Sequence, residues 1–496
     1  MTLFQKFIMA ILAIGIAGCG IWFSHDLEGP ERWLALGGGP LGGLALLMLS
    51  PKEKPVLRFG NLRWNQRELC QHILITGGTG SGKTISAVHS ILLQLTRNIP
   101  NWGGMVLGAK GDEHEFIMDL FREEGRAGDC VLMQVRPDNA PDDWEPPSRL
   151  NLLSDRSLPW SAHAKAIVDT ASALTDGQQS AFFKPAARDA LANLFELIDR
   201  NGETPTHTRA LELISSQSLL QKYVEHIVTT QDLDDAENSR LISYFTSVFL
   251  ESQASEQREG IAGTVKTYLE PFAHSAITEV FSSKKPNTFE IADVDEGAVI
   301  TVALPQRFVV ERRYLNTYLK TLLYYHARRR FDLPKKEQET KNQLLLVGDE
   351  FHELATSSKD GTSDHAIIDR VRSARLAIIG AMQSILSPDP FIGRENRTSL
   401  ILNFRTRFYF QAAEEEDAKA AAETVGRKDV IKTSKTSKPF GSPTYTKRKE
   451  EDFILKPKIF RSLRPHEAVV VHPTANRYRR MKIPPRLADG TIPNWY

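Results

Sequence analysis

A glycine-rich octapeptide at residues 77–84 constrains the fold of this chain more than any other feature. It reads Gly-Gly-Thr-Gly-Ser-Gly-Lys-Thr and directly follows the apolar run at 73–75, as in a phosphate-binding loop between a strand and a helix. Glycines let the backbone curl around phosphates with its N–H groups pointing inward. The segment 85–95 is predicted to be that helix, whose N-terminus would favour an anion. The sequence therefore predicts a nucleoside triphosphate site formed by Gly77, Gly78, Thr79, Gly80, Ser81, Gly82, Lys83 and Thr84.

Side chains suited to hydrolysis of such a ligand stand in the loop and after two further apolar runs. Lys83 is expected to reach the β- and γ-phosphates, and the Thr84 hydroxyl to bind Mg²⁺. Asp349 is expected to hold the same Mg²⁺, and its neighbour Glu350 to act as the base on the attacking water. Gln383 is expected to sense the γ-phosphate or to position the water; the other interpretation is a strand-end glutamine that only bonds to backbone. These residues predict an ATPase that uses ATP and Mg²⁺.

Apolar runs alternate with helical patterns along most of the chain. Strands are expected at 73–75, 105–107, 298–304, 344–350, 376–382, 406–411 and 468–472. This alternation predicts an α/β fold with a mostly parallel sheet, covered on both faces, that binds ligands at the carboxyl ends of its strands. Between about 161 and 282 the pattern is helical throughout, so an all-α domain is expected to interrupt the nucleotide-binding fold. The Pro- and Asp-rich stretch 136–147 is expected to be a surface loop.

Composition excludes several classes of protein. The hydrophobic share of 41% in 496 residues suffices for a large core. The net charge is +1, so a nucleic-acid partner would have to bind a local basic patch. The cysteines have neither a disulfide framework nor metal-ligand spacing, and the histidines are scattered.

The N-terminus carries two uncharged apolar runs, 7–23 and 33–49, each roughly 17 residues long, the lower limit for crossing a bilayer. The segment between them is mainly acidic, whereas lysine and arginine flank the pair. This bias predicts a transmembrane hairpin with both ends in the cytoplasm. Two alternatives are a pair of buried helices and a lipoprotein signal ending at Cys19. The expected domains are 1–55 (the hairpin, with a short periplasmic loop), 56–155 and 286–496 (the two parts of the nucleotide-binding domain), and 156–285 (the all-α insert).

The segment 427–449 is basic and rich in serine and threonine. A solvated flexible loop is the simpler interpretation, and contact with nucleic acid or lipid headgroups is the alternative.

Several motifs together resemble the type IV secretion coupling proteins of the TraG/TraD kind, within the FtsK/HerA branch of motor ATPases. The motifs that carry the resemblance run in order from the membrane hairpin almost to the C-terminus: 60–64, 77–84, 109–111, 182–187, 263–269, 349–351, 381–384, 403–410 and 463–468. The resemblance implies a RecA-like phosphate-loop fold and a homo-hexameric pump at the bacterial inner membrane with its ATPase domain in the cytoplasm. It further implies delivery of relaxase-bound single-stranded DNA from the relaxosome to a type IV secretion channel in conjugation.

The resemblance also assigns a residue that spacing alone does not. Arg372 stands where the family tends to carry an arginine before the glutamine strand, and we expect it to act as a finger in the neighbouring subunit's site, with Arg375 as the second candidate. The other interpretation of both is surface arginines paired with acids. Gly108 and Gly348 depart from the family pattern, which often has an Asp and a bulkier apolar residue there. Two other functions stay open: a coupling ATPase for protein effectors, and a membrane scaffold or receptor that binds ATP with negligible turnover.

Overall fold

The computed structural model describes residues 54–109, 111, 113–174, 183–230, 235–251, 254–357, 363–438, 441–474 and 477–496. Both apolar N-terminal runs and the alternative lipidation site at Cys19 lie outside these ranges. The chain divides into two compact units, 1–56 and 57–496, and the fold described below is that of the second. Within the described ranges, no helix has the length and apolarity needed to cross a bilayer.

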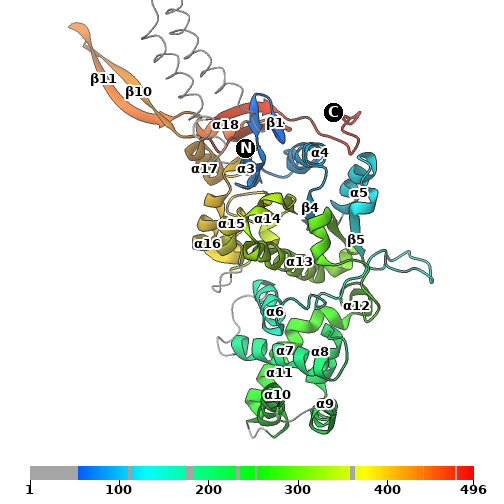
Figure 1. Cartoon of the computed structure of the whole chain (residues 1–496). Coiled ribbons are helices and arrows are strands. Elements are labelled where there is room, and N and C mark those ends of the chain that lie inside the picture. Colours follow the sequence, from blue (N-terminus) through cyan, green and yellow to red (C-terminus); the bar gives the residue numbers. More distant parts are fainter. Residues whose placement is uncertain are drawn as a thin grey trace, which may run out of the picture. The chain divides into compact units, whose positions relative to one another are not determined.

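In the described part of the chain, nine strands form one sheet that organises the second unit (Figure 1). Its spatial order is β13 (Tyr478–Lys482), β12 (Glu467–Val471), β9 (Thr406–Tyr409), β3 (Ile73–Thr76), β8 (Leu376–Met382), β7 (Leu344–Asp349), β4 (Gly103–Gly108), β6 (Val299–Ala303) and β5 (Cys130–Gln134). The pairings from β9 through to β5 are parallel, and β12 pairs antiparallel with both β9 and β13. The predicted mostly parallel sheet is thus confirmed.

The central strands are the ones that the sequence predicts, because burial on both faces requires continuous apolar runs. Every residue of β3, β4, β7 and β8 is buried. Two edge strands, β5 and β13, were not predicted. β13 reads Tyr-Arg-Arg-Met-Lys and is mostly exposed, so it presents no apolar run. β5 reads Cys-Val-Leu-Met-Gln, a short apolar run that the sequence reasoning missed.

All the elements described between β5 and β6 are helical, as expected. They are α6 (Trp160–Leu174), α7 (Phe183–Arg200), α8 (His207–Ser215), α9 (Gln217–Thr230), α10 (Ala236–Phe245), α11 (Ser255–Leu269), α12 (Ser275–Phe281) and short 3-10 or π turns. They gather below the sheet region in Figure 1, with α6 packed on α13 (Val309–Arg329). The apolar stripe of α7 is fully buried and shares one apolar core with Leu74 of β3 and Met105 of β4; its residues are Ala187, Leu191, Leu194, Phe195 and Ile198. The helices and the sheet therefore form one compact unit.

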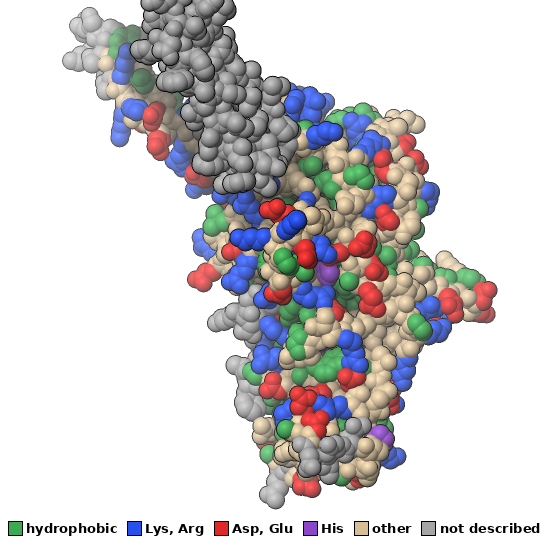
Figure 2. Space-filling model, in the orientation of Figure 1, with side chains coloured by type: hydrophobic (Ala, Val, Ile, Leu, Met, Phe, Trp, Pro, Cys, Tyr) green, Lys and Arg blue, Asp and Glu red, His purple; other side chains and the backbone are tan. Residues whose placement is uncertain are grey.

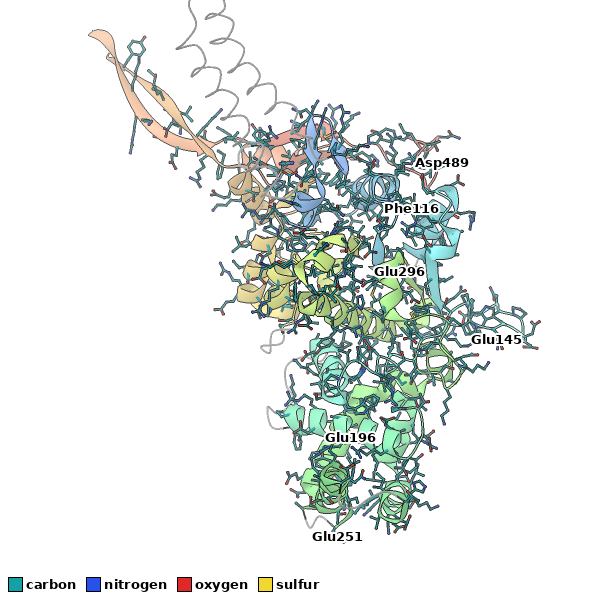
Figure 3. The ribbon with its side chains drawn as sticks, viewed as in Figure 1. Phe116, Glu145, Glu196, Glu251, Glu296 and Asp489 are labelled. Carbon is teal, nitrogen blue, oxygen red and sulfur yellow. The ribbon has the colours of Figure 1, made fainter. Side chains whose placement is uncertain are left out.

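The remaining helices connect the strands of the sheet and cover it. They are α3 (Gln66–Leu69), α4 (His89–Asn98), α5 (Glu113–Glu123), α14 (Lys335–Thr340), α15 (Asp364–Val371), α16 (Asp389–Asn403), α17 (Glu415–Val425) and α18 (Pro457–Arg461). A separate two-stranded sheet, β1 (Leu57–Phe59) with β2 (Leu62–Trp64), packs on the main sheet through Phe59, whose ring lies 4.9 Å from that of Phe408. The expected surface loop is confirmed: residues 136–147 contain no helix or strand and project outward at Glu145 (Figure 3).

The interpretation of 427–449 as a flexible loop is wrong. This segment forms most of a long antiparallel hairpin, β10 (Arg427–Lys438) with β11 (Gly441–Phe453), which projects from the unit in Figure 1. Threonine occurs in both strands, valine and isoleucine in β10 and tyrosine in β11, and all of these favour extended backbone. Among the side chains that the structure describes on this hairpin beyond its base, none is fully buried, and the sequence lacks the hydrophobic alternation that identifies most strands.

A buried histidine ties together the amino ends of three central strands. His72 precedes β3 with a φ of 62°; its Nε2 donates to the Ile368 carbonyl at 2.7 Å, and its Nδ1 accepts from the Ile378 N–H at 3.0 Å. Its backbone carbonyl accepts from the Thr406 N–H of β9. Burial lowers the pKa of His72 to about 4 although the bond to the Ile368 carbonyl opposes this shift, and the bond that Nδ1 accepts leaves no room there for a second ring proton.

We therefore expect acid to destabilise the fold through His72. The depressed pKa means that the neutral ring stabilises the native state fully above the unfolded pKa of about 6.5, and that this contribution is lost as pH falls towards 4. The loss amounts to at most about 3 kcal/mol at 1.36 kcal/mol per pKa unit. Denaturant titrations at pH 7 and pH 5, followed by tryptophan fluorescence, measure it. In His72→Asn, which tolerates a positive φ, the pH dependence over this window should be flatter; an unchanged dependence would contradict the assignment.

Candidate functional site

The phosphate loop lies where parallel strands end, at the carboxyl edge of the sheet. It leaves β3 at Thr76 and enters a π-helical turn, Lys83–Val88, which continues as α4. The predicted helix is present, although its first turn is π-helical. Gly80 (φ 76°) and Gly82 (φ 98°) adopt the left-handed backbone that favours glycine. A Cβ at Gly82 would lie 2.7 Å from the ring of His466, so glycine is also required by space.

The lysine of the loop points back into the loop. The Lys83 Nζ donates to the carbonyl of Gly77 at 2.7 Å and to that of Gly78 at 3.4 Å, and the side chain is buried. The nearby Ser81 hydroxyl is buried and has no hydrogen-bond partner among the described residues. A cationic donor held over a curled loop and an unsatisfied buried hydroxyl fit an anion in the loop.

The predicted metal ligands meet in space. The Thr84 hydroxyl donates to the Asp349 carboxylate at 3.0 Å, although 265 positions separate the two residues. Asp349 ends β7 and is buried. A hydroxyl and a carboxylate at this separation are hard oxygen ligands of the kind that Mg²⁺ uses beside phosphates, so these side chains fit the ion.

Glu350 and Gln383 also come together, at the tips of the neighbouring strands β7 and β8. The Gln383 Nε2 lies 3.4 Å from the Glu350 Oε1. Glu350 has a φ of 52°, a strained left-handed backbone for a non-glycine residue, which turns its side chain away from the strand direction. The Gln383 backbone carbonyl accepts from the Gly77 N–H at 3.3 Å, which joins this pair to the phosphate loop.

His352 is a site residue that the sequence reasoning missed. Its Nδ1 lies 3.6 Å from the Glu350 carboxylate. Burial lowers the pKa of His352, so at neutral pH the ring stays uncharged beside Glu350. Adjacent Asp349-Glu350 gives no hint of a histidine partner, but the position two residues on could have been considered.

A buried ion pair fixes the segment that follows Glu350. Lys320 of α13 donates to Asp364 at 2.5 Å and to the carbonyl of Leu354, and neither charged side chain is exposed. Asp364 also accepts from the Thr356 N–H and from the Tyr324 hydroxyl. Breaking such a pair on one side leaves a buried charge uncompensated, so the turn after Glu350 is strongly held.

The structure explains both glycines that depart from the family pattern. The carboxylate of Glu113 fills the space that a Cβ at Gly108 would occupy, at 1.9 Å, and it accepts from the Gly111 N–H. An acid is thus present at this turn, but it comes from α5. A Cβ at Gly348 would lie 2.7 Å from the ring of Phe351, which is fully buried beneath β7 and β8.

The C-terminal segment covers the other side of the phosphate loop. The backbone N–H of His466 donates to the Ser81 carbonyl at 2.9 Å. The Nδ1 atom of the same residue lies 2.8 Å from the Ser86 hydroxyl. The exposed rings of Trp495 and Tyr496 lie 6.1 and 5.1 Å from that of His466. The same segment runs along α4, where His89 stacks on Phe116 and Arg97 donates to the Asp489 carbonyl (Figure 3). His466 lies in the 463–468 motif, but the sequence gives no hint of its contact with the phosphate loop.

The arginines predicted as fingers lie at the opposite edge of the sheet. Arg372 ends α15, four residues before β8 begins, whereas Gln383 follows the last residue of β8. Arg372 is exposed, and no carboxylate pairs with it among the described residues. Arg375 is partly buried and donates to the Glu339 carbonyl at 2.7 Å. Neither reaches the phosphate loop of its own subunit.

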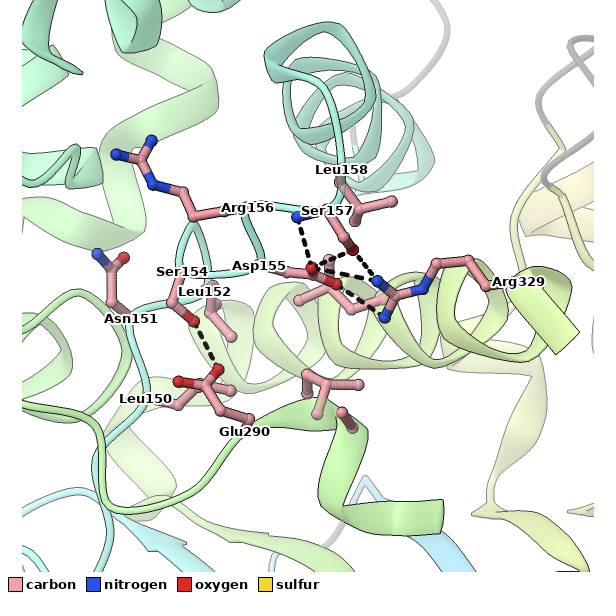
Figure 4. Close-up of a pocket in the computed structure, with 13 residues that line it drawn as sticks. Leu150, Asn151, Leu152, Ser154, Asp155, Arg156, Ser157, Leu158, Glu290 and Arg329 are labelled. Carbon is pink, nitrogen blue, oxygen red and sulfur yellow. Dashed lines mark hydrogen bonds and ion pairs between the residues drawn. The ribbon is translucent and has the colours of Figure 1, made fainter. Parts of the chain in front are cut away.

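A second cleft lies at the junction between the helices and the sheet (Figure 4). Asp155 accepts from Arg329 of α13, and Ser154 donates to Glu290, which lies in the segment between α12 and β6. Each of these charged groups has a partner: Asp155 pairs with Arg329, Glu290 accepts from Ser154, and Arg156 pairs with Asp199 of α7, outside the cleft. This arrangement is suited to holding the helices in place and leaves the phosphate loop as the candidate site.

The strand order, the crossover connections and the loop after β3 define a RecA-like α/β fold with a phosphate loop at the carboxyl edge of its sheet. The chain belongs to the type IV secretory system conjugative DNA transfer family, whose model matches residues 46–483. The resemblance drawn from the motifs is thereby confirmed. None of the curated proteins compared with the chain matches it.

The fold is similar to that of solved conjugative coupling proteins. The unbound form of the bacterial conjugative coupling protein TrwBdeltaN70 superposes with a TM-score of 0.60 at 16% identity, covering 89% of this chain and 91% of that one. TrwB in complex with the non-hydrolysable ATP analogue ADPNP gives 0.59 at 14%, covering 88% and 91%. TrwB with ADP and Mg²⁺ gives 0.59 at 13%, covering 90% and 92%.

Proposed function

We propose that this chain is a conjugative coupling ATPase that binds ATP and Mg²⁺ in the Gly77–Thr84 loop and delivers single-stranded DNA, bound to its relaxase, to a type IV secretion channel. The observation that carries the proposal is the Thr84–Asp349 contact of 3.0 Å beside Lys83, in a chain of the conjugative DNA transfer family. The titles of similar structures name complexes with ADPNP and with ADP and Mg²⁺, which supports the same ligands here.

Each site residue has a distinct part in this proposal. Bound Mg²⁺ supplies positive charge to the β- and γ-phosphates. Thr84 and Asp349 hold that ion, and Lys83 leaves the loop carbonyls to contact the terminal phosphates. Glu350 accepts a proton from the attacking water, and Gln383, 3.4 Å from it, orients that water.

Assembly and location follow the resemblance. The chain forms a homo-hexamer anchored in the bacterial inner membrane by residues 1–55, with a cytoplasmic nucleotide-binding domain in two parts (56–155 and 286–496) and the all-α insert 156–285 facing the substrate. Relaxosome and channel proteins are its partners. A coupling ATPase for protein effectors is the second candidate, and DNA-stimulated ATPase activity of the full chain distinguishes the two.

Replacing Glu350 with glutamine should stop hydrolysis while ATP remains bound. The ion ligand Asp349 and the cation Lys83 are intact in this variant, whereas the amide cannot accept the proton. Hydrolysis is measured by phosphate release and binding with a fluorescent ATP analogue. Hydrolysis at the parental rate would contradict the assignment of the base, and loss of binding would assign Glu350 to holding the nucleotide. If ATP hydrolysis by the parental chain does not respond to single-stranded DNA, the second candidate function is favoured.

A further inference from the structure

The β10–β11 hairpin has two different faces. In an antiparallel pair, residues directly opposite share a face, so one face carries Ile431 with Lys449, Thr433 with Lys447, and Tyr445 two residues further along β11. Ile431 is 67% exposed and Tyr445 is 59% exposed. The opposite face carries Val430 with Glu450 and Lys432 with Arg448, and here Lys432 pairs with Glu450 at 2.7 Å. We call the first of these the apolar-basic face.

Charge separates along the length of the hairpin. The acids Asp429, Glu450, Glu451 and Asp452 lie near its base, whereas every charged residue from 430 to 449 is basic. On the apolar-basic face, Lys449 pairs with Asp429 at 2.7 Å, but Lys447 has no acidic partner among the described residues. Figure 2 shows Lys and Arg side chains along the projecting hairpin with hydrophobic ones among them.

The base of the β10–β11 hairpin lies at the same end of the sheet as β1 and β2, the first elements of the unit. Its strands follow α17, whose Thr424 hydroxyl accepts from the Tyr409 hydroxyl of β9, and precede α18, whose Phe460 ring lies 5.8 Å from that of Tyr409. The first elements of the unit, β1 and β2, pack on the neighbouring strands of the same sheet edge, where Trp64 lies 4.7 Å from His472. A strand of twelve residues reaches about 40 Å.

We propose that the apolar-basic face of the hairpin lies on a membrane surface that contains anionic phospholipid. Lysines attract such a surface, and tyrosine favours the interface between headgroups and acyl chains. The exposed aliphatic Ile431 favours lipid over a nucleic acid, which offers phosphates and base faces but no aliphatic layer. The departure point favours it too, since β1 and β2, the first elements of the unit, pack on the same end of the sheet. This inference rests on the membrane anchor of the proposed function.

A dye on each face tests the proposal in the full chain. In a background without reactive cysteines, Thr433→Cys or Val430→Cys carries an environment-sensitive fluorophore, and the protein is placed in nanodiscs of phosphatidylcholine alone or mixed with phosphatidylglycerol. We expect a shift to shorter emission wavelength at 433 only with phosphatidylglycerol, and a several-fold smaller shift at 430. The Lys447→Gln, Lys449→Gln double variant should reduce the shift at 433 several-fold, as should high salt.

Three outcomes would overturn it. These are equal responses at 433 and 430, no response at 433 with phosphatidylglycerol, and a response at 433 to a single-stranded oligonucleotide in detergent, which would assign the face to nucleic acid. Co-elution of the protein with labelled lipid tests the membrane anchor separately. A chain that enters the discs without a shift at 433 therefore overturns the hairpin proposal and leaves the proposed anchor intact.

Discussion

Lys83→Ala is expected to reduce ATP hydrolysis to background and with it any DNA transfer that the chain supports. The lysine is the cation of the phosphate loop, and it is already held there by the Gly77 carbonyl at 2.7 Å. Removing one preorganised donor from a developing charge costs about 10²- to 10³-fold in rate, and loss of its full charge should add to this. Phosphate release by the full chain measures the effect. Hydrolysis near the parental rate would remove the loop from the mechanism.

Two controls keep this result interpretable. Lys165→Ala removes a lysine from α6, where it pairs with Asp169 at 2.8 Å, and should leave hydrolysis unchanged. Glu350→Gln should bind the nucleotide more tightly than Lys83→Ala, because it keeps the cation. If the Lys83 variant also unfolds at a much lower temperature than the parent, the rate would report on folding, so the thermal unfolding of both lysine variants should be compared.

The site could be predicted from the sequence largely because each of its parts is local. A curled loop needs glycines, and a strand buried on both faces needs an apolar run, so Gly77, Asp349 and Gln383 could each be placed at or directly after the end of a strand. Parallel strands then bring their carboxyl ends to one edge. This explains why Thr84 and Asp349, far apart in the sequence, were expected to meet.

Features that depend on packing between distant segments could not be predicted in this way. The contact of His466 with Ser86 joins two residues 380 positions apart, neither of which belongs to a recognisable acid–base motif. The neutral state of His72 depends on burial against Ile368 and Ile378. The β10–β11 hairpin has no buried apolar face along its exposed part, so its polar, basic sequence resembles a loop. Pattern reasoning detects burial, and these features lack a local burial signal.

The position of Arg372 decides how an arginine finger could act. Arg372 lies at the amino end of β8 and Gln383 at the carboxyl end. The strand between them has seven residues, which corresponds to more than about 20 Å. Arg372 therefore cannot serve the phosphate loop of its own subunit, and its exposure without an acidic partner among the described residues leaves it available to a neighbour. Arg375 is less suited, because its guanidinium donates to Glu339 and its carbonyl accepts from Leu344 and Gln343.

Arg372→Ala should lower hydrolysis by roughly 10³- to 10⁵-fold, the range for an arginine finger, and should be rescued by mixing with Lys83→Ala. Each variant alone lacks one half of every site. In a mixed ring, a subunit with an intact Lys83 can lie beside a neighbour with an intact Arg372, so some sites become complete. Arg375→Ala is the matched control. Because the contacts of Arg375 lie within its own subunit, mixing this variant with Lys83→Ala should restore no hydrolysis. Subunit exchange is verified with two affinity tags on the variants. Mixed rings that exchange subunits yet regain no hydrolysis would exclude a finger acting between subunits at this position.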